Sequence, residues 1–386
     1  MRAALSGFLA LLLVVASTAS AQVNRRSWIS LDEAARHGLV RQFVTQIEID
    51  RSGDQVAGLV LEGDMIFAQS NRGVVHALDA ESGRTLWVRQ IGRRGYANLP
   101  ASANHEYLCV PRDTVLYIVG RRTGRVEREI DLMGAASGPT AMGDEWVYVP
   151  MTSGKVRAFH LLDPPDATWA YRGTGLTDSR PLVTSDQLLW NSLGGYVYAC
   201  AATRPEIHYE VKTGGPLHVA LAYRSPLVYA ASDDRILYAI EESSGRIVWR
   251  LPIGEAPRHE AIVIGDDLYL VGRVDGIFAI DAVSGVVKWQ MRQVREFISA
   301  SADHLYVADG FGRTIVLDRA SGAALDALAT EALEMKYTNA QNDRLYLGRP
   351  SGLLCCFHEV GLPEPLVHRE SSTPPETEAD PFATGE

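Results

Sequence analysis

The stretch "AIDAVSGVVKW" at residues 279–289 decides the fold, because the chain carries three versions of it. "ALDAESGRTLW" at 77–87 and "AIEESSGRIVW" at 239–249 have the same length and the same order of residue types. Each version places a glycine four residues before a closing tryptophan. A motif that recurs in this way indicates a structural unit that the chain repeats.

Weaker copies of the motif fill the intervals. "RRTGRVE" around Gly124 lies 41 residues after Gly83, and "DRASGAAL" around Gly322 lies 37 residues after Gly285. The 121 residues between Gly124 and Gly245 leave room for two drifted copies. Eight apolar runs recur at steps of 37–42 residues: "DMIFA", "EYLCV", "EWVYV", "QLLWN", "PLVYA", "DLYLV", "HLYVA" and "RLYLG". This period is typical of solenoids, propellers and arrays.

Each unit contains four short strand-like runs. In residues 261–291 the runs are rich in Val, Ile, Leu and Tyr, and "GDD", "RVDG" and "AVSG" separate them. A run such as "LYLV", apolar at every position, predicts a strand buried on both faces. Four-stranded sheets stacked around an axis bury both faces. We therefore predict an all-β fold, an eight-bladed β-propeller of four-stranded blades, over residues 41–361.

The motif itself is predicted to be structural. Its aspartate can accept hydrogen bonds from turn amides, and its glycine can adopt a positive φ. The tryptophan is large enough to pack on the neighbouring blade. The residues assigned to this role are Asp79, Gly83, Trp87, Gly245, Trp249, Asp281, Gly285 and Trp289.

The ring must close at its ends. The last unit lacks a fourth strand, and the strand-like "RQFVTQIEID" at 41–50 has no blade of its own. We expect the two to pair, which completes the last blade and removes an open edge. In the N-terminal segment 22–40, Ser30 and Glu33 form a capping box and Gly38 ends a short helix over 30–38. We expect this helix to lie outside the closing blade.

The two ends of the chain differ in composition from the repeat region. Residues 1–21 combine Arg2, a short apolar core and a small-residue cleavage site, which predicts a signal peptide and a periplasmic or secreted protein with no transmembrane span. Residues 362–386 hold six carboxylates and five prolines, so we expect a disordered acidic tail. A net charge of −10 without a Lys/Arg cluster disfavours nucleic acid as a partner. We predict a monomer.

The "AxDxxxGxxxW" signature on a period near 40 residues resembles the pyrroloquinoline-quinone (PQQ)-type propeller repeat family over about residues 41–361. That family includes quinoprotein alcohol dehydrogenases and BamB-like outer-membrane assembly propellers, and the chain is closest in kind to the latter. The resemblance implies the propeller fold. It leaves the function open, because the same propeller serves catalysis and scaffolding.

Candidate binding residues stand where first strands open toward the central funnel: Arg180, His218, Arg258, His259, Glu296, Lys336 and Tyr337. Resemblance to the quinoproteins would imply PQQ beside a calcium ion held by carboxylate and amide oxygens. These openings show no carboxylate pair at calcium-loop spacing, and the ten histidines show no ligand spacing. We therefore predict no cofactor, no metal and no catalytic residue, with PQQ and calcium as the alternative.

Adjacent cysteines are the feature that favours the alternative, since quinoprotein alcohol dehydrogenases carry a bond between such a pair near the cofactor. Cys355 and Cys356 lie inside the strand-like "LLCCFH", where neighbouring side chains point to opposite faces. A bond between them would require a distorted peptide. We predict two buried thiols, and we expect no disulfide for Cys109 and Cys200, which lie in other blades.

Three functions follow from these observations. The favoured one is an exported non-catalytic propeller that binds a protein or peptide partner in the cell envelope, because mixed charges at the funnel suit such contacts. The second is a quinone-dependent dehydrogenase. The third is a propeller that binds a carbohydrate or another small molecule in its funnel.

Overall fold

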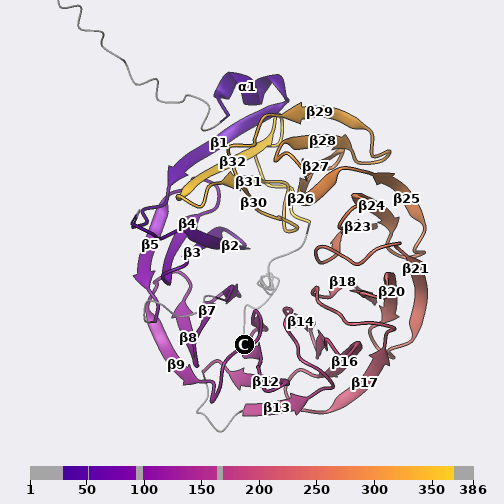
Figure 1. Ribbon diagram of the computed structural model, residues 1–386. Coiled ribbons are helices and arrows are strands. Elements are labelled where there is room, and N and C mark those ends of the chain that lie inside the picture. The colour runs from indigo at the N-terminus through magenta and orange to yellow at the C-terminus, as the bar shows by residue number, and fades with distance from the viewer. Residues whose placement is uncertain (1–28, 51, 93–98, 163–167, 369–386) are drawn as a thin grey trace, which may run out of the picture.

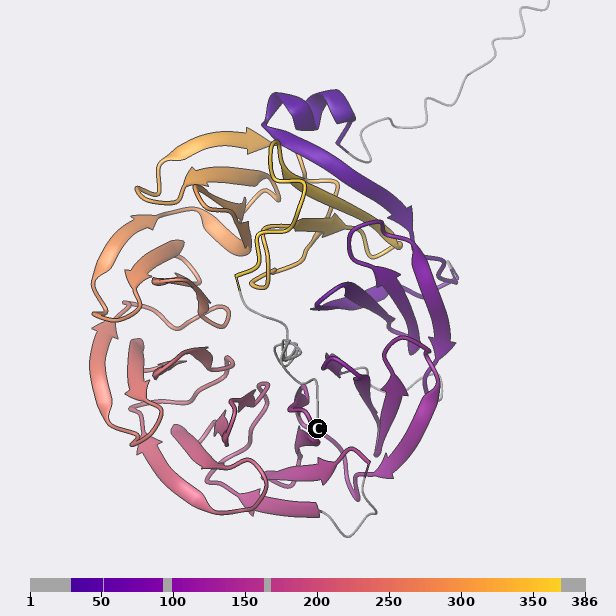
Figure 2. The same ribbon diagram turned by 180° about the vertical axis from the view of Figure 1, so that it is seen from behind.

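Eight four-stranded antiparallel sheets form a ring in the computed structural model, which describes residues 29–50, 52–92, 99–162 and 168–368 (Figure 1). The predicted eight-bladed β-propeller is confirmed. In blades 1 to 7 one continuous stretch of chain supplies four strands in sequence order. Each strand pairs with the next one, so the chain returns to the axis to begin every blade (Figures 1 and 2).

The first four blades contain strands β2 to β17. Blades 1 and 2 are β2 Val56–Glu62, β3 Met65–Ser70, β4 Val74–Asp79, β5 Thr85–Gln90, β6 Ser102–Ala103, β7 Tyr107–Arg112, β8 Val115–Gly120 and β9 Val126–Asp131. Blades 3 and 4 are β10 Ala141–Met142, β11 Trp146–Pro150, β12 Lys155–His160, β13 Thr168–Arg172, β14 Leu182–Val183, β15 Gln187–Asn191, β16 Tyr196–Ala201 and β17 Ile207–Lys212.

The other four blades complete the ring. Blades 5 and 6 are β18 Ala222–Arg224, β19 Leu227–Ala231, β20 Ile236–Glu241, β21 Ile247–Pro252, β22 Ile262–Ile264, β23 Asp267–Val271, β24 Ile277–Asp281 and β25 Val287–Met291. Blades 7 and 8 are β26 Val294–Ala300, β27 His304–Asp309, β28 Thr314–Asp318, β29 Ala324–Leu328, β30 Met335–Lys336, β31 Leu345–Gly348, β32 Leu353–Glu359 and β1 Leu39–Gln46.

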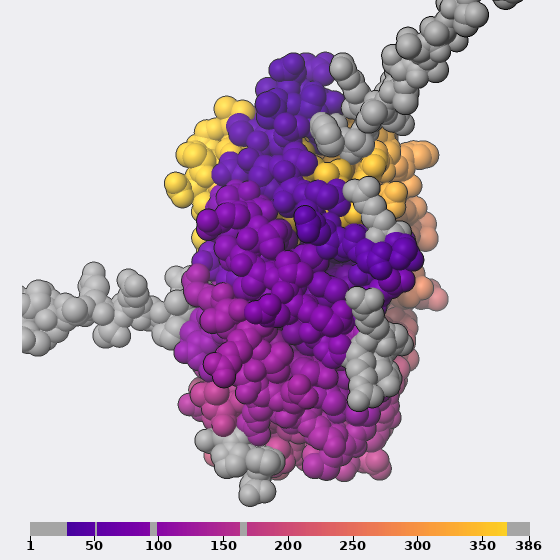
Figure 3. Space-filling view, turned by 90° about the vertical axis from the view of Figure 1, so that its left-hand side faces the viewer, coloured from indigo at the N-terminus to yellow at the C-terminus, as the bar shows by residue number. Residues whose placement is uncertain are grey.

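Blade 8 is built from both ends of the chain, as predicted. Strand β1 pairs antiparallel with β32, from Leu39 opposite Glu359 to Gln46 opposite Leu353. The strand begins and ends earlier than the predicted 41–50. Seen from the edge, the indigo residues at the start of the described chain pack beside the yellow residues near its end (Figure 3). Strand β1 therefore covers the edge of β32 that would otherwise be unpaired, and blade 8 has four strands like the other blades.

A single short helix precedes β1 in the described part of the chain. Helix α1, Leu31–Arg36, begins where the Ser30 side chain accepts a hydrogen bond from the Glu33 backbone N–H, and Gly38 follows it with φ +72°. The helix lies outside the ring beside β1 (Figure 1), and His37 contacts Asp326 of β29. It therefore covers the junction of blades 7 and 8.

The start of the tail departs from the expectation of disorder. Residues 362–368 run from the rim toward the axis (Figures 1 and 2). Val367 pairs with Asn342, and the His368 backbone N–H donates to the Gln341 carbonyl. The prediction of disorder from residue 362 is wrong for these seven residues, because backbone hydrogen bonds to blade 8 hold them. The remainder of the tail and the expected signal peptide lie outside the described residues.

The two faces of the ring differ in their turns. Because neighbouring strands are antiparallel, turns after first and third strands lie on one face, here called the turn face, which includes Gly83 and Gly285. Turns after second and fourth strands lie on the other, here called the mouth face, which includes His218 and His259. Within the described residues, no helix is both long and apolar enough to cross a membrane.

Candidate functional site

On the turn face, the glycine turn of one blade lies against an aromatic ring of the preceding blade. A Cβ atom on Gly124 would lie 2.6 Å from Trp87, and one on Gly285 would lie 2.6 Å from Trp249. The Trp87 indole N–H also donates to the Arg121 carbonyl of the next blade at 2.8 Å. The glycine therefore allows both a positive φ and a close approach that any side chain would prevent.

Two of these aromatic residues were missed in the sequence. Gly83 lies against Phe43 of β1, and Gly245 lies against Tyr209 of β17. Neither aromatic belongs to a recognisable copy of the motif, although each precedes its glycine by 40 or 36 residues, about one period. Because Phe43 is in the closing strand, the last blade is joined to the first by the same contact that joins blades 1 and 2, 4 and 5, 5 and 6, and 6 and 7.

The motif aspartates bind their own turns. Asp79 accepts hydrogen bonds from the Ser82 backbone N–H at 2.8 Å and from its hydroxyl at 2.6 Å, and Asp281 does the same with Ser284. The Ser284 N–H and hydroxyl hold the pKa of the Asp281 carboxyl below its usual value. These contacts stabilise the turn and leave the carboxylates engaged within one blade.

On the mouth face, charged residues of different blades meet instead. Arg180, before blade 4, lies 3.4 Å from the Glu260 carboxylate, before blade 6. His218 lies between two carboxylates, with Nδ1 3.4 Å from Asp178 and Nε2 3.4 Å from Asp233. The sequence did not predict these pairings, because the contacts join residues up to 80 positions apart.

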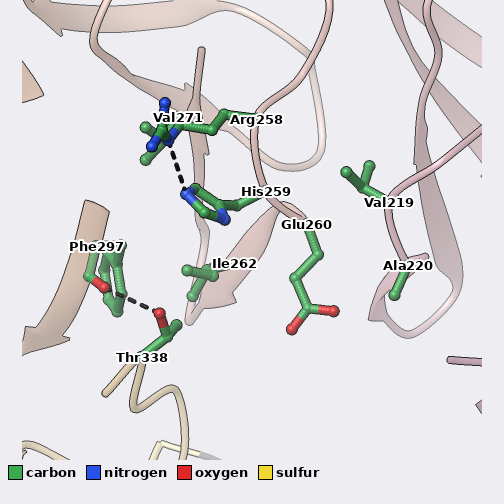
Figure 4. Close-up of a pocket in the computed structure, with 9 residues that line it drawn as sticks. All are labelled: Val219, Ala220, Arg258, His259, Glu260, Ile262, Val271, Phe297 and Thr338. Carbon is green, nitrogen blue, oxygen red and sulfur yellow. Dashed lines mark hydrogen bonds between the residues drawn. The ribbon is translucent and has the colours of Figure 1, made fainter. Parts of the chain in front are cut away.

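A cavity of about 300 Å³ opens here, between blades 5, 6, 7 and 8 (Figure 4). Its lining residues are Val219, Ala220, Arg258, His259, Glu260, Ile262, Val271, Phe297 and Thr338. Figure 4 shows an apolar wall, with the Arg258–His259 pair at one edge and the Glu260 carboxylate at another. The cavity can therefore hold an apolar group whose ends carry charge or hydrogen-bonding atoms.

The cation at the cavity edge is arginine. Arg258 Nε donates to His259 Nε2 at 3.1 Å. Burial, together with the neighbouring Arg258 charge, lowers the pKa of His259. The histidine is thus neutral at pH 7 and orients the guanidinium, which carries the positive charge of the pair.

Lys336 and Tyr337 do not line this cavity. The Lys336 ammonium donates to the Thr330 carbonyl at 2.9 Å and to the Leu333 carbonyl, and burial lowers its pKa to about 8. The Tyr337 hydroxyl accepts a hydrogen bond from the Leu61 N–H at 2.9 Å, which joins blade 8 to blade 1. Of the remaining candidates, Glu296 lies in β26 next to Phe297, which does line the cavity.

The cysteines are buried free thiols, as predicted. Cys355 packs in the cluster that contains Leu39 and Tyr306, and Cys356 packs in the cluster that contains Phe43 and Ile66. The two side chains therefore point to opposite faces of blade 8. No group of three or more His, Cys, Asp or Glu side chains that could hold a metal ion occurs within the described ranges.

Comparison with known proteins places this geometry in a family. The sequence profile described as outer membrane protein assembly factor BamB matches residues 26–201 and 183–343, well over half of the chain. Proteins with that name from Yersinia pestis and Moranella endobia are 23% and 24% identical to it over 260 residues. The alignments cover 59% of this chain and 64% and 65% of the relatives, so the chain spans less than two thirds of either.

Solved structures of similar shape agree on the architecture. BamB from Moraxella catarrhalis has a TM-score of 0.64 at 15% identity, over 82% of this chain and 100% of that one. The computationally designed Ika8 protein has a TM-score of 0.64 at 9% identity, over 79% and 96%. At these identities the likeness shows the propeller fold alone. The profile match over more than half of the chain shows the family: this protein belongs to the outer membrane protein assembly factor BamB family.

Proposed function

We propose that the protein is an exported scaffold of the cell envelope, periplasmic or secreted, that holds a segment of a partner protein at its mouth face and catalyses no reaction. The observation that carries this proposal is the cavity beside Arg258 and His259, where four blades contribute residues that the repeat does not contain. Family membership supports the envelope setting, since the relatives are named as outer membrane assembly factors.

The cavity suits a peptide segment. Its volume of about 300 Å³ is at the small end for ligand pockets and larger than one side chain, so it has room for an apolar side chain together with its backbone. Arg258 would then bind a carboxylate or carbonyl beside that side chain, and Glu260 or the Thr338 hydroxyl would bind a neighbouring N–H. An apolar centre with a polar rim is the usual composition of a protein interface.

The residues present do not fit a quinone–calcium pair, and we propose that none binds. PQQ carries three carboxylates, and calcium adds a demand for several convergent oxygens. Arg180 is already paired with Glu260, and Lys336 is engaged by backbone carbonyls. Cys355 and Cys356 point into two separate cores of blade 8.

Site-specific photocrosslinking in the source organism tests the scaffold function. A photoreactive amino acid replaces Val219 or Thr338 at the cavity, and Val286, which is 61% exposed on the turn face, serves as the matched control. We expect the two cavity positions to crosslink one and the same envelope protein that the control does not. Equal crosslinking from both faces, or no crosslink from the cavity, would reject the proposal.

A small ligand with a carboxylate is the second candidate, because the Arg258 guanidinium and the Thr338 hydroxyl line the same cavity. Calorimetric titration with glucuronate, a sugar acid, checks it. Binding that Arg258→Gln abolishes would favour the small ligand over the peptide. If millimolar glucuronate produces no heat of binding, this candidate is rejected.

A further inference from the structure

Two apolar side chains stand out from the mouth face on neighbouring blades. Val274, in the turn between β23 and β24, is 71% exposed, and Phe311, in the turn between β27 and β28, is 79% exposed. The corresponding turns of blades 5 and 8 carry "SDDR" at 232–235 and "RPSG" at 349–352. The turn geometry therefore does not require an apolar residue at this place.

Hydrogen bonds to carboxylates order the backbone of both turns. The Glu255 carboxylate accepts hydrogen bonds from the Val274 N–H at 2.7 Å and the Asp275 N–H at 2.6 Å. The Asp309 carboxylate accepts hydrogen bonds from the N–H groups of Phe311 and Arg313, both at 2.9 Å. A turn whose backbone is ordered before a partner arrives loses little backbone entropy on binding.

Arg295 joins the two turns into one surface. Its guanidinium donates to the Arg273 carbonyl at 2.8 Å, next to Val274, and its side chain lies 3.7 Å from the position of a Cβ atom on Gly310, next to Phe311. Arg273 and Arg292 are exposed on the same side. Within the described residues, Arg273, Arg292 and Arg295 form no ion pair. We call Arg273, Val274, Arg292, Arg295 and Phe311 the arginine surface.

We propose that the arginine surface binds an acidic segment of a partner protein, with an apolar side chain between Val274 and Phe311 and carboxylates on the three arginines. The chain as a whole is acidic, with a net charge of −10, whereas this surface brings together, around two exposed apolar groups, three arginines that have no ion pair within the described residues. Arginine and large aromatic residues dominate the binding energy of protein interfaces, and arginine binds carboxylates with two parallel hydrogen bonds.

The proposal deepens the scaffold function by adding a second contact outside the cavity. It rests on the proposed scaffold function in one respect only, which is that the partner is a protein. The photocrosslinks at Val219 and Thr338 report on the cavity, whereas the binding test below reports on the arginine surface. Failure of either proposal is therefore distinguishable from failure of the other.

Fluorescence anisotropy with a labelled synthetic peptide tests the arginine surface on the full chain. The probe is an acidic peptide with one central Phe, and its control replaces every Asp and Glu by Asn and Gln. We expect only the acidic peptide to bind, with an affinity that falls as salt is added. Binding of both peptides alike, or of neither, would overturn the proposal.

Two pairs of variants locate the contact. Arg273→Glu with Arg292→Glu should weaken binding by about tenfold or more, and Arg84→Glu with Arg125→Glu, on exposed arginines of the turn face, should leave it unchanged. Phe311→Ser should weaken it, and Val286→Ser should not. Equal losses of affinity in the test and control variants would overturn the proposal, because they would indicate that the peptide is attracted by the overall charge and not by a specific surface.

The chain's own acidic tail is the competing occupant. A full-length variant with Glu370, Glu376 and Glu378 changed to Gln and Asp380 changed to Asn removes four of its charges. We expect this variant and the unchanged chain to bind the probe with the same affinity. Tighter binding by the variant would show that the tail occupies the arginine surface, which would overturn the assignment to a partner.

Discussion

The turn face and the mouth face are built from the same blades, yet they use their residues differently. On the turn face one contact recurs, glycine against an aromatic ring of the preceding blade: Gly83 on Phe43, Gly124 on Trp87, Gly245 on Tyr209, Gly285 on Trp249 and Gly322 on Trp289. On the mouth face each blade presents different residues, such as Arg180, His218 and Arg258. Repeated residues hold the ring together, and unrepeated ones are available for binding.

The acidic residues show the same division. Asp79 and Asp281 accept hydrogen bonds from their own turns. Glu260 and Asp178 instead contact Arg180 and His218 of other blades across the mouth. Substitutions on the turn face should therefore change stability, whereas those on the mouth face should change binding.

The largest effect is expected from removing β1. A chain that begins after Gln46 loses the outer strand of blade 8 and the Phe43 contact with Gly83, so it should no longer unfold cooperatively. Circular dichroism melting and size-exclusion chromatography measure this. Deletion of residues 369–386 is the control and should not change the melt; equal melting of both truncated chains would show that closure is dispensable.

Trp289→Ala on the turn face should destabilise the protein by about 3–5 kcal/mol, because it empties the contact between blades 6 and 7 and removes the hydrogen bond to the Arg319 carbonyl. Denaturant unfolding gives the value. Phe311→Ala on the mouth face should change stability by about 0.5 kcal/mol or less. Similar values for the two variants would break the distinction between the faces.

Gly322→Ala should cost about 1–3 kcal/mol, since the new Cβ would lie 2.5 Å from Cδ2 of Trp289 and the backbone φ is +71°. A double-mutant cycle with Trp289→Ala separates the two causes. In that background we expect a smaller cost, from backbone strain alone. An unchanged cost would mean that the tryptophan does not require the glycine.

Lys336 gives a pH dependence of defined sign. Burial lowers its pKa from 10.5 to about 8 in the folded protein, so the unfolded chain binds more protons between these values. This group therefore makes the free energy of unfolding rise as pH increases from about 8 to 10.5. Denaturant unfolding at pH 8 and pH 10 gives the free energy of unfolding of the unchanged chain and of Lys336→Met. The unchanged chain should gain stability relative to the variant between these pH values, and an equal difference at both would contradict the prediction.

The smallest effect is expected at His218. Its side chain is 46% exposed between Asp178 and Asp233, and His218→Asn should change stability by about 0.5 kcal/mol or less. Chemical unfolding at pH 7 checks this value. A loss above about 2 kcal/mol would show that the mouth face also holds the ring together, and the comparison would need revision.

Much of the ring was predictable from the chain alone. The 40-residue period, the motif glycines and the apolar runs predicted eight blades, and the unpaired strand near residue 41 predicted closure. These features are local, because a turn needs its glycine within a few residues and a buried strand needs consecutive apolar side chains. Residues close together in the sequence meet both requirements, so both can be recognised without a structure.

Only the tertiary structure decided which candidates meet. Lys336 and Tyr337 appeared equivalent to Arg258 in the sequence, yet they bond within the ring, and the cavity instead includes Val219 and Phe297. The same holds for two contacts between blades. Arg180 pairs with Glu260, and Arg295 joins two turns, only because of the positions that the blades take around the axis. The sequence determined the strands and turns of this propeller, because local conformation and burial set them. The tertiary structure decided its binding surface, because contacts between blades join residues that are not neighbours in the sequence, as Arg180 and Glu260 show.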